Sequence, residues 1–240
     1  MAWTDRTQML LGEEGLSRLR SAHVLLVGCG GVGAYAAEML ARAGLGALTV
    51  IDSDTVSDTN RNRQILALTS TVGRPKCAVL ADRLADINPE IRVTPVEEYL
   101  SEENAAQLIS ADFDFVIDAI DTLSPKIALI QRCLALGLPL VSSMGSGAKF
   151  DATKVRIADI SKTYQCPLAH MLRKRLHKLG IYSGFLAVFS EELPRRESVV
   201  IEESANKKSQ VGTISYIPAV FGCVCAQAAI SQIAGVERNY

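Results

Sequence analysis

The stretch LLVGCGGVGAYAAEML (residues 25–40) decides the fold of this chain. An apolar run at 23–28 ends in glycine, and apolar residues then recur at helical spacing over 33–44. Such a run is typical of a buried parallel strand, and the glycines allow a tight turn into a helix whose first amides favour phosphate. The stretch predicts a strand, a nucleotide-binding loop and a helix, with the loop glycines at Gly28, Gly30, Gly31 and Gly33.

Strand-like and helix-like segments alternate after this loop. Apolar runs predict strands at 47–52, 91–96, 113–120 and 138–145, and amphipathic runs predict helices at 76–88, 101–109 and 126–137. Strands that alternate with helices of this length indicate right-handed βαβ units. We therefore expect an α/β fold with a doubly wound, mostly parallel, Rossmann-like sheet.

The pattern changes near Lys149. Short apolar runs predict strands at 154–160 and 185–190, with antiparallel pairing as one interpretation, and a basic amphipathic helix is predicted between them at 166–180. A polar segment at 194–212 predicts a mobile loop, and an apolar segment at 219–236 predicts a core helix. We divide the chain into a nucleotide-binding region, 1–148, and a smaller mixed extension of the same domain, 149–240.

Composition limits the classes of function. The 240 residues are 48% hydrophobic with a net charge of −1, which indicates a large soluble domain whose overall field does not attract nucleic acid. The N-terminus lacks the basic and apolar regions of a secretory signal, and membrane contact by the apolar C-terminal segment is not expected. The six cysteines never form C-x-x-C, which argues against structural zinc and favours reduced thiols in a cytoplasmic protein.

Asp52 ends the strand after the glycine loop, 24 residues beyond Gly28. A carboxylate at this position can accept hydrogen bonds from ribose hydroxyls. The loop and Asp52 together fit NAD, FAD, S-adenosylmethionine or ATP.

Polar residues that follow the second strand favour a triphosphate. Asn60, Arg63 and Lys76 supply an amide and two cations, which hydride chemistry does not need beside a pyrophosphate. Attack at an α-phosphorus does need them, because charge spreads over the phosphate oxygens. Asp121 follows the fourth strand, where a carboxylate can hold Mg²⁺. Each residue also has a plain alternative, as a surface ion pair, a solvated charge or a helix cap.

The motifs VGCGGVG, IDSDTVSDTNRNRQ, VGRPK and DAIDT occur in this order within residues 6–145. In this set the chain resembles the ubiquitin-activating-enzyme-like superfamily, which includes the bacterial ThiF, MoeB and HesA proteins. The resemblance implies an enzyme that uses ATP and Mg²⁺ to convert a carboxylate into an acyl-adenylate.

The resemblance also implies roles for individual residues. The glycine loop would receive the phosphates, Asp121 would be associated with the metal, and Arg6 would reach the triphosphate of a neighbouring protomer in a homodimer. The remaining nucleotide-binding residues implied by it are Asp52, Asp54, Asn60, Arg63, Gln64 and Lys76.

A narrower resemblance is to the tRNA threonylcarbamoyladenosine dehydratase branch, through TNRNRQI, INPEIRVT and VIDAID, and it extends to about residue 180. It implies that the substrate is the threonylcarbamoyl carboxylate on adenosine 37 of tRNA. A nucleophile already tethered to the substrate would displace AMP, so no protein thiol is needed. The two C-x-x-C zinc pairs usual in MoeB and ThiF are absent, and a monovalent cation is left open as an additional ion.

Three alternatives remain open. The first is adenylation of a ubiquitin-fold or sulfur-carrier protein, and the second is an NAD-binding oxidoreductase or a non-catalytic nucleotide-binding partner. The third is a thiol acceptor, for which Cys166 is a better candidate than Cys223 or Cys225, since buried thiols are usually inert.

A local basic surface would suit RNA phosphates. The alternative is an ordinary solvated helix face. The candidate residues are Arg173, Lys174, Arg175, His177, Lys178, Arg195, Arg196, Lys207 and Lys208.

Overall fold

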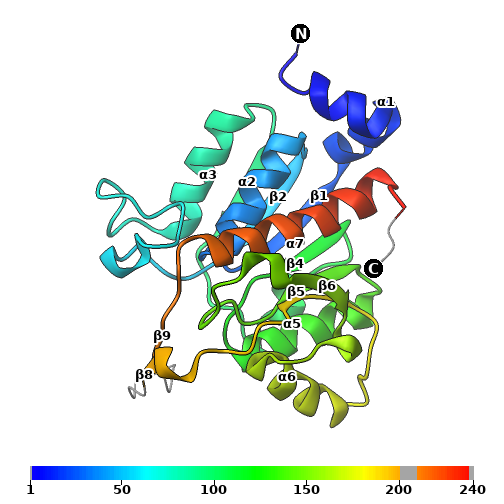
Figure 1. The fold of residues 1–240 in the computed structure, drawn as a ribbon. Coiled ribbons are helices and arrows are strands. Elements are labelled where there is room, and N and C mark those ends of the chain that lie inside the picture. Colours follow the sequence, from blue (N-terminus) through cyan, green and yellow to red (C-terminus); the bar gives the residue numbers. More distant parts are fainter. Residues whose placement is uncertain (1, 201–209, 238–240) are drawn as a thin grey trace.

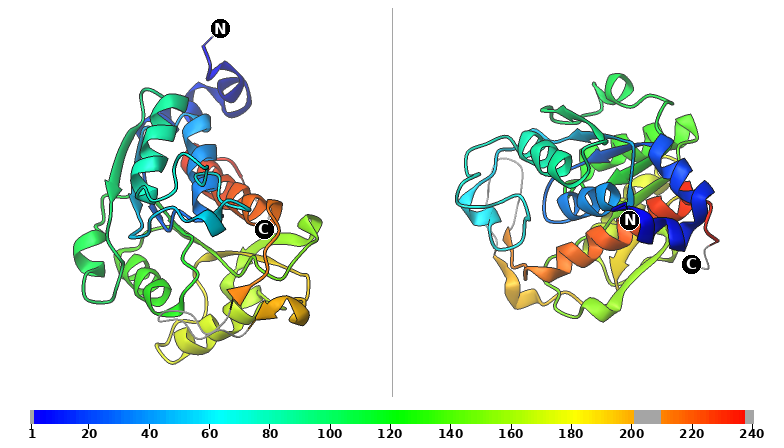
Figure 2. Two further views of the ribbon diagram at one scale, coloured as in Figure 1. Left: turned by 90° about the vertical axis from the view of Figure 1, so that its left-hand side faces the viewer. Right: turned by 90° about the horizontal axis from the view of Figure 1, so that it is seen from above.

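The computed structural model describes residues 2–200 and 210–237 and arranges them as helices on both faces of one central sheet (Figure 1; Figure 2). The sheet has seven strands in the order β3-β2-β1-β4-β5-β7-β6. Their bounds are β1 His23–Val27, β2 Ala47–Ile51, β3 Arg92–Val96, β4 Phe115–Asp118, β5 Leu140–Ser143, β6 Val155–Asp159 and β7 Leu186–Ser190. All neighbouring strands are parallel except β6, which is antiparallel to β7. The expected doubly wound α/β fold is confirmed.

Alternate residues of the central strands face the two helical layers, as strand geometry requires. On β1, Val24 and Leu26 belong to one buried cluster, whereas Leu25 and Val27 belong to the other. The first cluster includes α2 (Gly33–Ala43), α3 (Lys76–Ile87) and α7 (Tyr216–Ala234), and the second includes α5 (Leu123–Leu136), α6 (Pro167–His177) and the short α4 (Ala105–Leu108). Burial on both faces explains why these strands are continuous apolar runs.

Helix α1 (Asp5–Ser21) lies at the amino edge of the sheet. The amide of Gly46 donates to the carbonyl of Leu19 at 3.0 Å, and the amide of Ala47 donates to Ala22 at 3.0 Å. The second half of the helix also packs against the C-terminal end of α7, where a Cβ at Gly15 would lie 3.5 Å from Ala234 Cβ. The first turns of α1 therefore lie away from the carboxyl ends of the strands.

Two expected helices have different bounds. The α5 helix begins at Leu123 and not at 126, because Pro125 is tolerated in a first turn, where no amide partner is needed. The segment expected as a helix at 101–109 is helical only from Ala105. Its first residues form a turn in which the Asn104 side chain accepts from the Ser101 amide at 2.8 Å.

The C-terminal extension differs from expectation in one segment. In the segment expected as a mobile loop, 194–212, a short 3₁₀ turn (Arg196–Ser198) leads into β8 (Val199–Val200), which pairs with β9 (Gln210–Val211). The mobility of this segment stays a prediction. Residues 201–209, with Lys207 and Lys208, lie outside the described residues. The expected antiparallel pair is confirmed as β6 and β7, but β7 is also parallel to β5 and so continues the main sheet. The division at residue 148 stays a prediction.

Helix α7 is long and apolar enough to cross a membrane. It instead packs across α2 and the sheet, with Phe221, Cys225 and Ala229 fully buried. At Gly222 a Cβ atom would lie 2.4 Å from the Val32 carbonyl oxygen, so α7 needs glycine to cross the start of α2. The expected core helix is confirmed.

Candidate nucleotide-binding site

The glycine loop connects β1 to α2 at the carboxyl edge of the sheet. Gly28 has a positive φ of 96°, and a Cβ at Gly33 would lie 1.8 Å from the Gly28 carbonyl oxygen, so packing within the protein requires both glycines. At Gly30 the nearest atom to a Cβ would be Gln64 Nε2, at 3.8 Å. Packing therefore does not explain Gly30, whereas close approach of a ligand to the backbone does.

Asp52 holds this loop against the end of β2. Its carboxylate accepts from the Cys29 amide at 2.6 Å through one oxygen and from the Asp54 amide at 2.8 Å through the other. Burial raises the pKa of the Asp52 carboxyl, and the charge of Lys76 and the two amides oppose that shift. The oxygens keep lone pairs that can accept from ribose hydroxyls.

Lys76 opens α3 and lies buried behind Asp54. Its ammonium is 2.7 Å from the Asp54 carboxylate, and its backbone amide donates to the Asp54 carbonyl at 3.0 Å. The Asp54 side chain is 68% exposed, so the pair presents a carboxylate to solvent with the cation beneath it. The sequence placed both residues at the site but did not predict that they pair.

Arg63, Asn60 and Gln64 come from the loop between β2 and α3. The Arg63 guanidinium donates to the Asn62 side chain at 2.8 Å, and the Arg63 Cγ atom would lie 3.5 Å from a Cβ at Gly31. This contact places Arg63 against the glycine loop. The side-chain Oδ1 of Asn60 accepts from the Ser57 amide at 3.1 Å and shapes the turn.

Gln64 is buried and its amide nitrogen faces Gly30. Its Oε1 atom is buried without a hydrogen-bond partner among the residues that the structure describes. A buried acceptor is normally satisfied, so this atom fits a donor supplied by a ligand. These features together fit the phosphates and sugar of a nucleotide.

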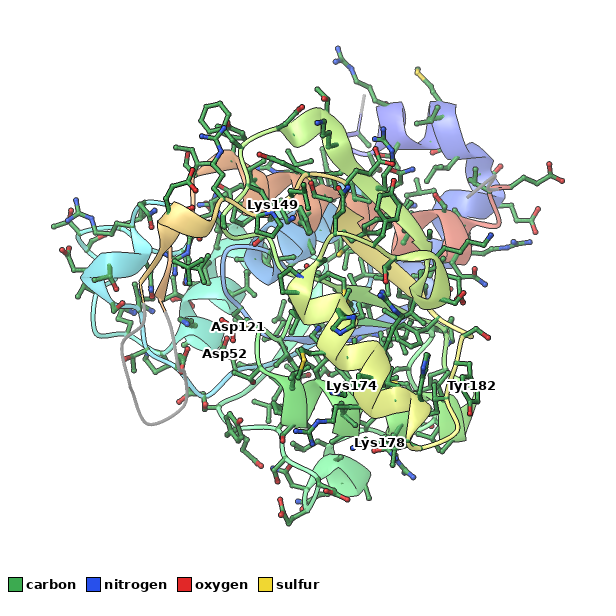
Figure 3. All side chains as sticks on the ribbon, turned by 60° about the horizontal axis from the view of Figure 1, so that its bottom comes forward. Asp52, Asp121, Lys149, Lys174, Lys178 and Tyr182 are labelled. Atoms are coloured by element: carbon green, nitrogen blue, oxygen red, sulfur yellow. The ribbon has the colours of Figure 1, made fainter. Side chains whose placement is uncertain are left out.

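Asp121 follows β4 and is exposed at the same edge, and Figure 3 labels it and Asp52. Within 2–200 and 210–237, no group of three or more His, Cys, Asp or Glu side chains could hold a metal ion. A cation at Asp121 would therefore need phosphate oxygens as further ligands, which is the usual mode for Mg²⁺ at nucleotides.

A buried cluster beneath Asp121 was not predicted from the sequence. The Lys126 ammonium is 2.7 Å from the Asp118 carboxylate and 3.1 Å from the Ser142 hydroxyl, and both charged side chains are fully buried. Asp118 also accepts from the Ile120 amide at 3.0 Å. The cluster thus joins β4, β5 and α5 below the loop that carries Asp121. Two features of the sequence could have predicted this cluster: the acid Asp118 at the end of an apolar strand and Lys126 within an apolar helix.

Arg6 is exposed on α1, at the amino edge of the sheet. Figure 1 shows α1 at the top of the molecule, whereas α2 and α3 begin at their lower ends. Arg6 therefore does not join the other site residues within one chain. A role at the nucleotide requires a second protomer.

Burial makes several of the described thiols poor nucleophiles. Burial raises the pKa of Cys133 to about 12 and raises that of Cys225 still further. Cys166 is buried at the start of α6, and Cys223 is exposed on α7. A buried neutral thiol is a poor nucleophile.

The glycine loop, the Asp52 carboxylate and the adjacent cations fit a nucleotide-binding protein of the doubly wound α/β class. The model of the ThiF family matches residues 4–240, and the chain belongs to this family. The family expected from the motifs is confirmed.

Three relatives are informative. The chain is 45% identical to the tRNA threonylcarbamoyladenosine dehydratase of Bacillus subtilis (strain 168), over 85% of this chain and 79% of that protein. It matches the crystal structure of the E. coli tRNA N6-threonylcarbamoyladenosine dehydratase in complex with ATP with a TM-score of 0.89 and 40% identity, over 96% of this chain and 93% of that one. The molybdopterin-synthase adenylyltransferase of E. coli (strain K12) is 39% identical over only 64% of this chain and 61% of that protein.

Proposed function

We propose that this protein uses ATP to adenylate the threonylcarbamoyl carboxylate on adenosine 37 of tRNA and then closes a ring with loss of AMP. The observation that carries this proposal is the nucleotide site itself. Asp52 and Arg63 lie against the glycine loop and Lys76 pairs with Asp54 after the same strand, in a chain 40% identical to a dehydratase solved with ATP.

The first step would be attack of the substrate carboxylate on the α-phosphorus. A new P–O bond forms, the bond to the β-phosphate oxygen breaks, and pyrophosphate leaves. Lys76 and Arg63 would stabilise the charge that develops on the phosphate oxygens, and Asp52 would fix the ribose. Lys76 is held in advance by Asp54, so only a small movement is needed to meet a phosphate.

The second step would be intramolecular. A nucleophile in the threonylcarbamoyl group attacks the activated carbonyl carbon, loses its proton to solvent, and releases AMP as the acyl–oxygen bond breaks. Holding both groups on one substrate supplies the proximity that a protein thiol would otherwise provide. The burial of Cys133, Cys166 and Cys225 is consistent with this route.

Asp121 would hold Mg²⁺, and Asp54, which follows β2 at the same edge of the sheet, would assist. When bound, the cation would neutralise charge on the departing pyrophosphate. A monovalent cation is an open additional ion, and a cytoplasmic location stays a prediction.

The proposal includes a homodimer in which Arg6 enters the neighbouring protomer's nucleotide site. The support is geometric: Arg6 is exposed at the edge opposite to its own site. Exposed apolar residues beside it, Trp3, Met9 and Leu10, are available for a subunit contact.

The test is ATP–pyrophosphate exchange with the purified protein. We expect exchange that depends on tRNA carrying threonylcarbamoyladenosine, followed by AMP release and a product lighter by one water. Exchange driven by a protein ending in Gly-Gly would favour the carrier-protein alternative. Absence of exchange with both substrates, together with NADH binding, would favour the oxidoreductase.

A further inference from the structure

Residues 160–190 form an acid-free segment in a chain that otherwise balances its charges. The whole chain has 26 acidic and 25 basic residues. The segment has no Asp or Glu, but it has five Lys or Arg residues and two of the three histidines. Because the net charge is near zero, any attraction for a polyanion must come from a local imbalance of this kind.

Helix α6 presents most of these charges on its solvent-facing side. Ala169, Leu172 and Leu176 pack into the core, so the opposite face carries Lys174 and Lys178, one turn apart. Figure 3 shows both lysines along this helix. Arg173 has a structural role, since its guanidinium donates to the Thr163 carbonyl at 2.8 Å.

The exposed lysines of α6 differ in their ion pairing from two exposed arginines on other helices. Arg18 pairs with Glu14 on α1, and Arg42 pairs with Glu38 on α2. Lys174 and Lys178 form no ion pair with any residue in the described part of the chain. Arg18 and Arg42 are thus partly neutralised by their acidic partners, whereas Lys174 and Lys178 are available to an anionic partner.

The helix begins beside the nucleotide site. Gly145 follows β5 at the carboxyl edge, and a Cβ there would lie 3.6 Å from Cys166 Sγ and 3.7 Å from Leu168 Cβ. From this point α6 runs 11 residues, which is about 16 Å of helix. A ligand lying along α6 therefore has one end close to the edge that carries Asp52 and Asp121 (Figure 3).

An aromatic side chain stands at the far end of the basic face. Tyr182 is 62% exposed, and its ring centroid is 4.9 Å from that of His177. Unpaired bases of RNA loops stack on exposed rings of this kind. An exposed ring beside two unpaired lysines suits RNA better than an acidic protein surface.

We propose that Lys174, Lys178 and Tyr182 form an RNA-docking surface, in which the lysines contact phosphates of the tRNA substrate and Tyr182 stacks on a base. This surface would orient the RNA so that its modified adenosine reaches the nucleotide site. The inference rests on the proposed function and adds the place where the substrate is held.

The experiment uses the full chain with Lys174→Glu, Lys178→Glu and the double variant. We expect KM for tRNA to rise about threefold for each single change and about tenfold for the double, with kcat at saturating tRNA and the Kd for ATP unchanged. The slope of log KM against log salt should fall by about one for each lysine. Tyr182→Ala should raise KM without changing this slope, and Tyr182→Phe should restore the wild-type KM.

The matched control is Arg92→Glu, which reverses an exposed charge at the amino edge, on β3. It should leave KM and the salt slope as in the wild type. If the double variant keeps the wild-type KM and slope, the docking surface is overturned while tRNA-dependent exchange by the wild type still supports the function. If the wild type shows no tRNA-dependent exchange, both proposals fall. Binding to anionic lipid vesicles in place of tRNA would also overturn the surface.

Discussion

The ammonium of Lys76 lies 2.7 Å from the carboxylate of Asp54, with the lysine buried and the acid exposed. The two residues are 22 positions apart and meet where β2 and α3 converge at the carboxyl edge. The pair keeps a cation desolvated and in place beside Asp52 before any phosphate arrives. Electrostatic catalysis depends on such preorganised charge.

Replacing Lys76 with methionine should abolish AMP formation, with a loss of at least about 100-fold, because the phosphate charge then has no buried cation to stabilise it. Methionine fills most of the lysine's volume, so the thermal unfolding midpoint should stay near that of the wild type. The control is Lys154→Met, an exposed lysine. Turnover of a folded Lys76→Met protein at the wild-type rate would refute the role of Lys76.

Arg63→Ala should lower the exchange rate by about 100-fold without unfolding the protein. Arg63 contacts the glycine loop, whereas Arg61, two positions earlier, pairs with the exposed Asp58. Arg61→Ala is therefore the matched control, and its exchange rate should be close to that of the wild type. Equal losses in the two variants would mean that the loop requires charge but not Arg63 in particular.

Lys126→Met should destabilise the fold by about 3–5 kcal/mol, because it leaves the Asp118 carboxylate buried without its partner. The double variant Lys126→Met/Asp118→Asn should recover much of that free energy of unfolding. Urea denaturation of the single and double variants measures the coupling. A single variant within about 0.5 kcal/mol of the wild type would contradict the buried pair.

Glu38 links α2 and α3 and should make the fold acid-sensitive. Burial raises the pKa of the Glu38 carboxyl, but hydrogen bonds from Arg83 and Arg42 outweigh burial and leave the pKa below its ordinary value. A depressed carboxyl pKa stabilises the fold above the unfolded value, about 4.3, and this contribution is lost as pH falls through the lower folded value.

Glu38→Gln should therefore cost about 1–2 kcal/mol at pH 7 and progressively less as the pH falls below about 4.3. Unfolding free energies measured from pH 7 to pH 3 test this. Parallel curves for the variant and the wild type would show that Glu38 is not the group responsible.

Mixing Arg6→Ala with Asp121→Ala protein should restore activity if sites are shared between protomers. Each variant alone should be inactive, while a heterodimer would hold one intact site of two, giving about a quarter of wild-type activity at equal mixing. The measurement is exchange after the subunits have been unfolded and refolded together. No recovery, with mixed dimers demonstrated by size and mass, would place Arg6 outside the site.

The sequence alone determined the local parts of this protein. The apolar run before Gly28, the glycine spacing and the position of Asp52 predicted a strand, loop and helix with a nucleotide at the loop, because these patterns depend on periodicity between near neighbours. The same reasoning placed Asn60, Arg63, Lys76 and Asp121 at one sheet edge, since parallel strands end together.

The tertiary structure decided how these residues meet. Folding brings together residues that are distant in the sequence, as in the pairs of Lys76 with Asp54 and of Lys126 with Asp118. Folding also places Arg6 at the edge of the sheet opposite to these pairs. The structure also showed that Lys174 and Lys178 of α6 form no ion pair with the described residues, whereas Arg18 and Arg42 on other helices do. Charge pairing depends on distance and burial in three dimensions, and neither is encoded in the spacing of residues along a strand or helix.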